Sequence, residues 1–356
     1  MAEGAKVREI NRLQRAQAAL PDELPPALRQ IDPTHVLHGG RKLIYFGGCD
    51  YFRLSWHPKI RRALVDGLAE HGLNVAASRI TTGNHPIYSQ LERALELFFR
   101  CEKALLLGNG YMTNLAVVQG VRSEITHALI DEQAHASLQD AAQLLERPVR
   151  RFAHGNPVAL LAALRSCGPK SRPLVLTEGF CAQDSTIAPI SDYLLALPKS
   201  ALVLMDDAHG VGTLGATARG AAELLYLDDP RVICTMTLSK AFGVYGGAIL
   251  SSSDIIKKIV QRSRLFQGHT PLPPPMAAAA LAAVHILSED IERRERLERN
   301  INHVHMRLAG AGHELPKVCS PIITMKFKTE PAKAQLKKAL LRAGIYPSFI
   351  HYPSGP

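Results

Sequence analysis

The stretch that decides the fold is Ala201-Leu202-Val203-Leu204-Met205-Asp206-Asp207-Ala208-His209-Gly210. An apolar run that ends at once in two carboxylates and a histidine is typical of a strand buried on both faces. In open α/β sheets, ligands bind outside the carboxyl ends of such strands. Asp206 and His209 are therefore candidate site residues, because an aspartate there can pair with the protonated nitrogen of a pyridine ring. The structural alternative is a helix N-cap beside a histidine that only packs.

Comparable apolar runs alternate with helical patterns over roughly residues 60–250. The predicted strands are 104–107, 128–130, 174–177, 201–205, 232–237 and 247–250. The predicted helices are 57–71, 88–100, 111–121, 136–146 and 157–166. Continuous apolar strands between helices predict an α/β fold, with a mostly parallel central sheet flanked by helices on both sides.

The chain is long enough for one large and one small domain. We predict an N-terminal helix and segment (1–45), a large α/β domain (46–275) and a small C-terminal α+β domain (276–356). Outside the central pattern, the predicted helices are 6–20, 254–265, 276–309 and 331–343, and the predicted strands are 42–46, 322–327 and 345–350.

Composition narrows the class of function. The formal net charge is +10, and the basic residues are spread along helical stretches. They form either solvated helix faces or a field that attracts an anionic substrate such as a coenzyme A thioester. No nucleic-acid motif is present, and aromatic residues make up 6% of the chain.

Localisation and metal binding also follow from simple patterns. The six cysteines are scattered without CxxC spacing, which argues against a disulfide framework and a zinc site. The first residues contain no apolar signal segment, and no apolar run is long enough to span a bilayer. We expect a cytoplasmic protein with no metal, nucleic-acid or membrane partner.

A second chemistry-bearing stretch is Thr237-Leu238-Ser239-Lys240-Ala241-Phe242-Gly243, followed by Gly246-Gly247. A lysine just past a buried strand is desolvated, which lowers its pKa and makes it nucleophilic. The glycines allow a ligand to approach the backbone. The alternative is a surface lysine in a turn.

Two further stretches connect strands to helices. One is Gly108-Asn109-Gly110-Tyr111-Met112-Thr113-Asn114, whose glycines precede a helix N-terminus and could cradle a phosphate. The other is Asp131-Glu132-Gln133-Ala134-His135-Ala136-Ser137, whose histidine could stack on a planar cofactor, move protons or be structural. A formal GxGxxG at 210–215 does not fit a dinucleotide site, because two aspartates stand where the pyrophosphate would lie.

Taken together and in order, these stretches resemble the α-oxoamine synthase family of fold-type-I enzymes that depend on pyridoxal 5′-phosphate (PLP). The resemblance runs from about residue 43 to the end of the chain and is closest to the 8-amino-7-oxononanoate synthase branch. The most specific matches are Asp206-Asp207-Ala208-His209-Gly210-x-Gly212 and Thr237-x-Ser239-Lys240-x-x-Gly243. The resemblance implies that the large domain binds PLP.

The resemblance also implies a role for each matching residue. Lys240 is similar to the lysine that holds the cofactor as a Schiff base, Asp206 to the partner of the pyridine nitrogen and His209 to the residue that bonds the ring hydroxyl. His135 resembles the histidine stacked on the ring. The remaining cofactor residues would hold the phosphate: Gly110, Tyr111, Thr237 and, from the neighbouring subunit of a homodimer with shared active sites, Thr270.

The implied reaction condenses a small amino acid with an acyl-CoA thioester and releases the carboxylate, as in biotin biosynthesis. The candidate substrate residues are Cys49, where the family has asparagine, Arg79, in its glycine-rich stretch, and His351, where the family has the arginine that binds the amino-acid carboxylate. Replacing a bidentate arginine weakens carboxylate binding. The alternatives are an aminotransferase or aldolase on the same scaffold, or a non-catalytic PLP-binding subunit.

Overall fold

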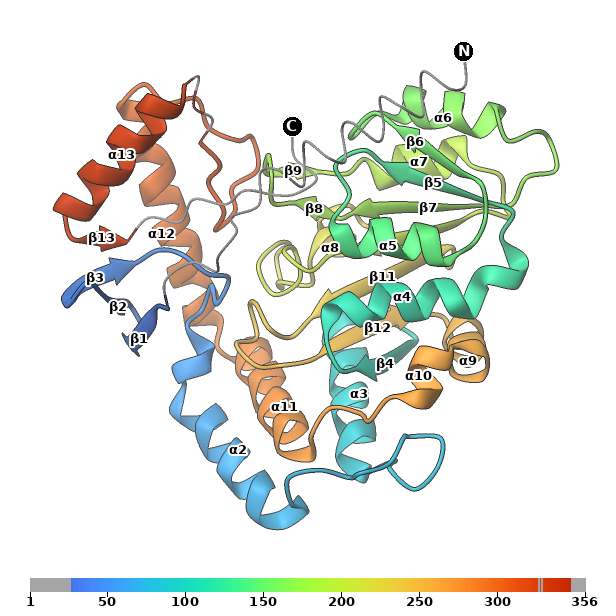
Figure 1. Ribbon diagram of the computed structural model, residues 1–356, viewed down its shortest axis with the longest axis horizontal. Helices are drawn as coiled ribbons and strands as arrows, with labels where there is room; N and C mark the ends of the chain where they lie inside the picture. Colours follow the sequence, from blue (N-terminus) through green and yellow to red (C-terminus); the bar gives the residue numbers. More distant parts are fainter. Residues whose placement is uncertain (1–26, 326, 328, 347–356) are drawn as a thin grey trace. The chain divides into compact units, whose positions relative to one another are not determined.

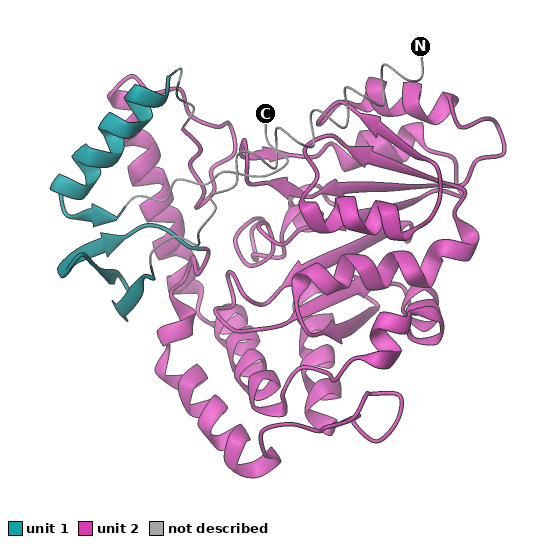
Figure 2. Ribbon diagram, viewed as in Figure 1, with its two compact units in different colours: residues 1–48, 327–356 teal, residues 49–326 magenta. Residues whose placement is uncertain are grey.

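The computed structural model describes residues 27–325, 327 and 329–346. The chain divides into two compact units, residues 49–326 and residues 1–48 with 327–356 (Figure 2). The predicted helix 6–20 lies outside the described residues. Among the helices that are described, none is long and apolar enough to cross a membrane.

The larger unit is built on a seven-stranded sheet (Figure 1). In sheet order its strands are β4 (Lys103–Leu107), β12 (Gly247–Ser251), β11 (Val232–Thr237), β10 (Leu202–Asp206), β7 (Pro173–Glu178), β5 (His127–Asp131) and β6 (Val149–Phe152). Only β12 runs antiparallel to its neighbours. The prediction of a mostly parallel central sheet is confirmed, and β6 is a strand that the apolar pattern missed because its residues are mainly exposed.

Helices cover both faces of this sheet. The described helices of this unit are α2 (Pro58–His71), α3 (Pro86–Phe99), α4 (Gly110–Val121), α5 (Ala136–Leu144), α6 (Pro157–Arg165), α7 (Ile190–Ala196), α8 (Ala221–Leu224), α9 (Ser253–Arg262), α10 (Arg264–Gly268), α11 (Pro274–Glu289) and α12 (Ile291–Gly310). Short elements complete the unit: η1 (Leu54–Trp56), η2 (Arg122–Glu124), β8 (Phe180–Cys181) and β9 (Thr186–Ile187).

The core explains why the strands read as continuous apolar runs. Successive strand residues point to opposite faces, so Val203 packs in one apolar cluster and Leu204 in the other. The cluster around Leu204 includes residues of α4, α5, α9 and α10, and the cluster around Val203 includes residues of α3 and α11. With both faces covered, the strand ends are the natural place for polar chemistry.

The smaller unit has its own four-stranded sheet. Its strands are β1 (Arg29–Asp32), β2 (His35–His38), β3 (Arg41–Tyr45) and β13 (Ile345–Tyr346), and its helix is α13 (Glu330–Arg342). β13 pairs parallel to β3, with Ile345 opposite Ile44. Strands from the beginning of the described chain and from its end therefore share one sheet.

This division differs from the predicted boundary at residue 276, which falls inside the larger unit. The reason is packing between α11 and α2. Gly67 lies so close to α11 that an added Cβ would be 2.9 Å from the Cβ of Ala278. The predicted boundaries were drawn from local patterns, which do not contain this contact.

Two local predictions are wrong. The helical region 276–309 is two helices, because Asp290 leaves the helical conformation and accepts a hydrogen bond from the Arg293 N–H as the N-cap of α12. Residues 322–325 form no strand. The Ile322 carbonyl there accepts hydrogen bonds from the Ser320 and Ser185 hydroxyls, so side chains take the place of a strand ladder.

Candidate active site

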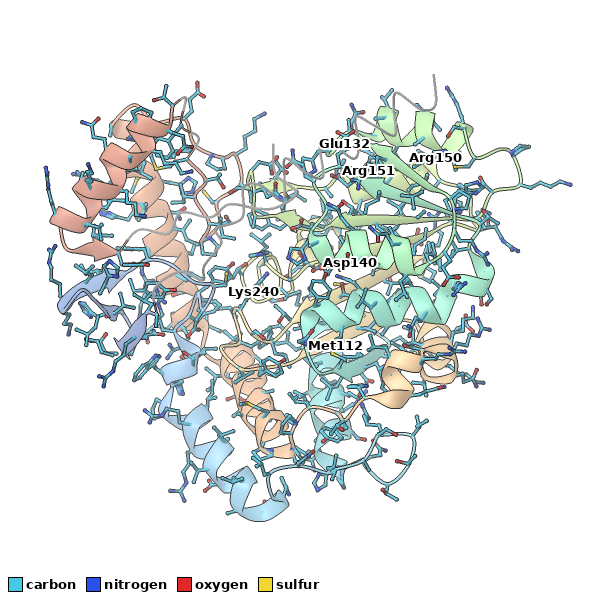
Figure 3. All side chains as sticks on the ribbon, in the orientation of Figure 1. Met112, Glu132, Asp140, Arg150, Arg151 and Lys240 are labelled. Atoms are coloured by element: carbon cyan, nitrogen blue, oxygen red, sulfur yellow. The ribbon has the colours of Figure 1, made fainter. Side chains whose placement is uncertain are left out.

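The candidate site lies where three adjacent strands end. Asp206 is the last residue of β10, Glu178 is its cross-strand partner at the end of β7, and Lys240 follows β11. Lys240 lies at the edge of the sheet where the parallel strands end (Figure 3). The sequence placed Asp206 and Lys240 at strand ends, and the sheet order makes those ends neighbours.

Asp206 is buried, with 8% of its surface exposed, and its carboxylate is held by two donors. Oδ2 accepts a hydrogen bond from Asn114 Nδ2 at 2.6 Å, and Oδ1 accepts one from the Ala208 N–H at 3.1 Å. Neither donor is a cation, so the carboxylate keeps its negative charge available for a positively charged partner. Asn114 was not among the predicted site residues.

Asp207 has a different environment from Asp206. It is fully buried, and its Oδ2 accepts a hydrogen bond from the Ala221 N–H at 2.7 Å. Glycines enclose it, since a Cβ on Gly210 or Gly220 would come within 2.1 Å of its oxygens. Burial raises the pKa of Asp207 to about 8. This side chain holds the loop after β10.

His135 is the N-cap of α5. Its Nδ1 accepts a hydrogen bond from the Ser137 N–H at 3.2 Å and lies 2.8 Å from Ser137 Oγ. Burial lowers the pKa of His135. The ring is therefore held neutral, and the Tyr111 ring contacts its edge with 6.2 Å between centroids.

His209 pairs with a tyrosine. The Tyr51 hydroxyl lies 2.7 Å from Nδ1 of His209. Burial lowers the pKa of His209 well below its usual value, and the nearby charge of Lys240 acts in the same direction. Tyr51 was not among the predicted site residues.

Lys240 itself is partly buried. Burial lowers the pKa of its ammonium group, and the negative charge of Asp206 only partly opposes this. Burial also raises the pKa of Glu178 to about 8, with the nearby Asp206 charge acting in the same direction. The strand ends thus combine one fixed carboxylate with groups whose protonation is poised near neutral pH.

The N-terminus of α4 forms a cradle beside Lys240's segment. Asn109 caps the helix by accepting from the Met112 N–H at 3.0 Å. A Cβ on Gly110 would lie 2.8 Å from the Thr237 Cβ, so glycine is needed for this approach. Thr237 Oγ1 accepts from the Ser239 N–H at 3.1 Å. A helix N-terminus with flanking hydroxyls favours an anion such as a phosphate.

Comparison with known proteins gives the family. The model of the aminotransferase class I and II family matches residues 56–354. The chain belongs to this family. It is 33% identical over 320 residues to 8-amino-7-oxononanoate synthase of Citrifermentans bemidjiense, covering 89% of this chain and 82% of the relative. The enzyme of the same name from Thioalkalivibrio sulfidiphilus is also 33% identical, over 89% of this chain and 81% of its own.

Solved structures agree. Serine palmitoyltransferase of Sphingomonas wittichii superposes with a TM-score of 0.87 at 26% identity, over 98% of this chain and 88% of that one. 8-Amino-7-oxononanoate synthase from Francisella tularensis gives a TM-score of 0.75 at 26% identity, over 88% and 89%. Serine palmitoyltransferase from S. paucimobilis, solved with bound PLP, gives 0.85 at 25% identity, over 98% and 92%.

These relatives confirm the family, the fold class and the cofactor PLP predicted from the sequence, and they confirm the enzyme class, a PLP-dependent C-acyltransferase of the α-oxoamine synthase type. The donor set fits the cofactor. The cradle at Gly110 suits its phosphate, and the buried Asp206 carboxylate suits its protonated ring nitrogen. The roles of individual residues remain proposals.

The predicted substrate residues are less uniform. Cys49 is partly buried and lies near Lys240. Its electrostatic effect on the pKa of Lys240 is smaller than the effects of burial and of Asp206. Arg79 forms a two-pronged ion pair with Glu92, with Nη2 3.0 Å from Oε2, and only 9% of its side chain is exposed. It would have to leave this pair to bind a substrate. His351 lies outside the described residues.

The other predicted phosphate residues differ in exposure. Tyr111 is 40% exposed, and its hydroxyl donates to Asp140. Thr270 is exposed in the single chain. Of the two, Tyr111 contacts another predicted site residue, through the edge of the His135 ring.

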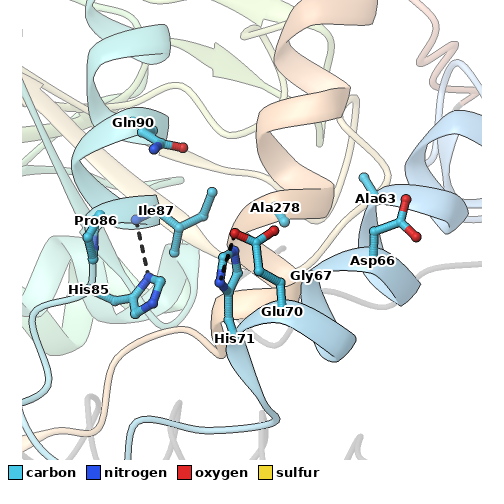
Figure 4. Close-up of a pocket in the computed structure, with 10 residues that line it drawn as sticks. All are labelled: Ala63, Asp66, Gly67, Glu70, His71, His85, Pro86, Ile87, Gln90 and Ala278. Carbon is cyan, nitrogen blue, oxygen red and sulfur yellow. Dashed lines mark hydrogen bonds and ion pairs between the residues drawn. The ribbon is translucent and has the colours of Figure 1, made fainter.

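A cavity lies away from these strand ends. It has a volume of about 440 Å³ and is lined by residues of α2, the start of α3 and Ala278 of α11 (Figure 4). None of the predicted site residues lines it.

One group of potential metal ligands occurs among the described residues. His154, Cys181 and Asp184 place their ligand atoms within 4.8 Å of one another. His154 is already bonded on both nitrogens, with Nδ1 2.8 Å from Asp131 Oδ1 and Nε2 3.3 Å from Asp184 Oδ2. Although burial lowers it, these carboxylates raise the pKa of His154 to about 12. The group is explained as a charged histidine between two aspartates.

Proposed function

We propose that this chain is a PLP-dependent acyltransferase that joins a small amino acid to an acyl-CoA thioester, with loss of the amino acid's carboxylate, to give an α-aminoketone. The observation that carries the proposal is the pair of neighbouring strand ends. Asp206 is fixed there by Asn114 and Ala208, and Lys240 is desolvated beside it.

The cofactor would be held from several sides. Lys240 would bind it covalently, Asp206 would pair with the ring nitrogen, His209 would bond the ring hydroxyl and His135 would cover the ring. When bound, PLP supplies an electron sink for the negative charge that develops at the substrate's Cα. The phosphate would lie against Gly110, Tyr111 and Thr237, with Thr270 contributed by the neighbouring subunit.

Lys240 is also the proposed base. Because burial lowers its pKa, a larger fraction of Nζ is uncharged at neutral pH than in an exposed lysine. Once released by the incoming amino acid, Nζ removes the proton from Cα. The nearby Glu178 carboxyl, whose pKa is raised to about 8, is protonated over part of the same pH range.

The remaining parts of the proposal concern the protein's partners, its location and its pathway. The net charge of +10 favours approach of an anionic CoA thioester. A homodimer agrees with the exposure of Thr270, which a partner's phosphate would cover. A cytoplasmic location and a place in biotin biosynthesis complete the proposal, and His351 is the proposed contact of the amino-acid carboxylate.

The test is a paired assay on the purified full-length chain with PLP. Visible absorption reports cofactor binding, and a panel of small amino acids is then combined with a panel of acyl-CoA thioesters. We expect release of free CoA thiol together with CO₂ from carboxyl-labelled amino acid, in equal amounts. Lys240→Ala is the control and should release neither.

Two results would redirect the proposal. Exchange of an amino group with a keto acid, without thiol release from any thioester, would indicate an aminotransferase. PLP binding through Lys240 with no turnover of any substrate pair would indicate a non-catalytic subunit.

A further inference from the structure

A single buried amide connects the two cofactor-facing regions of the site. Asn114 lies in α4, is fully buried, and donates both Nδ2 hydrogens. One goes to Asp206 Oδ2 at 2.6 Å and the other to Ser137 Oγ at 2.9 Å. Asp206 ends β10 and Ser137 lies in the first turn of α5, so the side chain of Asn114 links the sheet to both α4 and α5 (Figure 1).

The orientation of the amide is determined by its partners. Oδ1 accepts a hydrogen bond from Thr235 Oγ1 at 2.6 Å, and Thr235 is the register partner of Asp206 on β11. Rotating the amide by 180° would place Oδ1 against the Asp206 carboxylate, where neither group has a proton to donate. The Asp206 carboxylate therefore allows only one orientation, and the Thr235 hydroxyl donates to the oxygen on the other side.

The same chain of hydrogen bonds determines the tautomer of His135. Because Ser137 Oγ accepts from Asn114, its hydroxyl hydrogen is free to donate to His135 Nδ1, 2.8 Å away. The Ser137 N–H donates to that nitrogen as well. Nδ1 is thus an acceptor, and in the neutral ring the proton lies on Nε2.

We propose that Asn114 is a positioning residue: it orients the Asp206 carboxylate toward the cofactor nitrogen and, through Ser137, keeps His135 as the neutral Nε2–H tautomer. One buried amide then sets both the partner of the ring nitrogen and the donor pattern of the histidine that covers the ring. This inference rests on the proposed function, because it assigns Asp206 and His135 to the cofactor.

The groups around His135 are few among the described residues. Asp206, Lys240 and His209 interact with it electrostatically, Glu178 accepts its backbone N–H and Tyr111 contacts its edge. Replacing Asn114 changes none of these charges. A change in His135 titration would therefore report the hydrogen bonds and not a new charge.

The first experiment needs no activity. In the full-length chain labelled with ¹⁵N-histidine, with and without PLP, His135 is identified by its loss in His135→Gln. We expect an unprotonated Nδ1 and a protonated Nε2. In Asn114→Leu the Ser137 hydroxyl is no longer oriented toward Nδ1, and in Ser137→Ala that hydroxyl is removed. In each variant we expect the pKa of His135 to rise by about half a pH unit to one, because Nδ1 has a weaker donor or one donor fewer.

The second experiment measures PLP affinity in Asn114→Leu, a change of similar size that removes the amide. We expect the dissociation constant to rise about 10- to 100-fold, as for a lost hydrogen bond to a charged group. Ser137→Ala leaves the Asp206 contact in place and should weaken PLP binding far less. The matched control is Gln119→Leu on the same helix, which loses its bonds to Ser263 and Leu265 but has no link to the site.

The outcomes separate the two proposals. An Nδ1–H tautomer in the parent chain, or Asn114→Leu behaving like Gln119→Leu in both assays, would overturn the role of Asn114. The tautomer is read in the chain without PLP, so it stands or falls independently of turnover. Failure of the parent chain to bind PLP, with the expected tautomer present, would overturn the proposed function and the role of Asn114 toward the cofactor nitrogen, and would leave only its role in the hydrogen bonds to Ser137 and His135.

Discussion

His135 and His154 follow neighbouring strands, β5 and β6, which end at the same edge of the sheet. The two rings have opposite partners. Nδ1 of His135 faces two donors from Ser137, and burial keeps the ring neutral by lowering its pKa. Both nitrogens of His154 face carboxylates, which raise its pKa to about 12 and keep it charged.

The difference shows how the same residue type serves two purposes on one sheet edge. A neutral histidine next to Asp206 can lie against a planar cofactor without competing for the carboxylate's charge. A charged histidine between Asp131 and Asp184 joins the strand ends and the β8–β9 segment. The His135 side is built for chemistry and the His154 side for stability, and the two can be separated by mutation.

The largest expected effect is on the chemical side. Lys240→Ala should lower acyltransferase turnover by about three orders of magnitude or more, because both the covalent link and the base are lost. Removing a desolvated amine should leave the free energy of unfolding unchanged or slightly higher. Steady-state kinetics and urea unfolding of the same preparation measure both, and a large loss of stability would contradict the separation.

On the structural side, Asp131→Asn should lower the free energy of unfolding much more than it lowers turnover. Asp131 is buried and accepts hydrogen bonds from His154 and from the N–H groups of Gln133 and Gly155. Replacing the Asp131 carboxylate leaves the charged His154 with Asp184 as its one remaining carboxylate. We therefore expect the free energy of unfolding, measured in urea, to fall by about 3 kcal/mol. Asp254→Asn, in an exposed pair with Lys258, is the control and should cost under about 1 kcal/mol.

The charge on His154 predicts a pH dependence. Its folded-state pKa is raised, so its contribution is complete below the unfolded value near 6.5 and declines as the pH rises toward 12. The stability difference between the parent chain and His154→Gln should therefore shrink by up to about 1 kcal/mol per pH unit from pH 7 to 9. The comparison cancels the contributions of Glu178 and Asp207. A constant difference would mean that His154 is neutral.

The smallest effect is expected at Thr186. Its hydroxyl lies 2.7 Å from Asp184 Oδ1 and 3.0 Å from His154 Nε2, at the exposed side of the cluster. Thr186→Val should cost about 0.5 to 1 kcal/mol and should not change turnover. A loss of activity greater than the loss of stability would join the two sides that this comparison separates.

Much of the fold was predictable because the strands are buried on both faces. Continuous apolar runs such as 232–237 became strands at their predicted places. Two failures occurred where side-chain hydrogen bonds override the apolar pattern, at Asp290 and at Ile322. The stretch 322–327 was predicted as a strand, but the Ile322 carbonyl accepts hydrogen bonds from the Ser185 and Ser320 hydroxyls.

The site residues also divide into those that the sequence could indicate and those that it could not. Asn114 was quoted within its motif but not singled out, although it lies four residues after Gly110 and thus on the same helix face. Tyr51 offered no such signal, since its contact with His209 spans 158 positions in the chain. Arg79 was assigned to substrate from its place in the family's glycine-rich stretch. Its ion pair with Glu92 could not be predicted, because it forms only in the folded chain.

The sequence by itself determined that a lysine and an aspartate stand at the ends of buried strands, and the order and spacing of its motifs carried the resemblance that implied the family, the fold class and the cofactor. Only the tertiary structure decided that Asp207 is enclosed in the loop after β10 and which histidine carries a charge. The reason is that apolar periodicity and turn chemistry are local, whereas burial and hydrogen-bond partners come from distant segments.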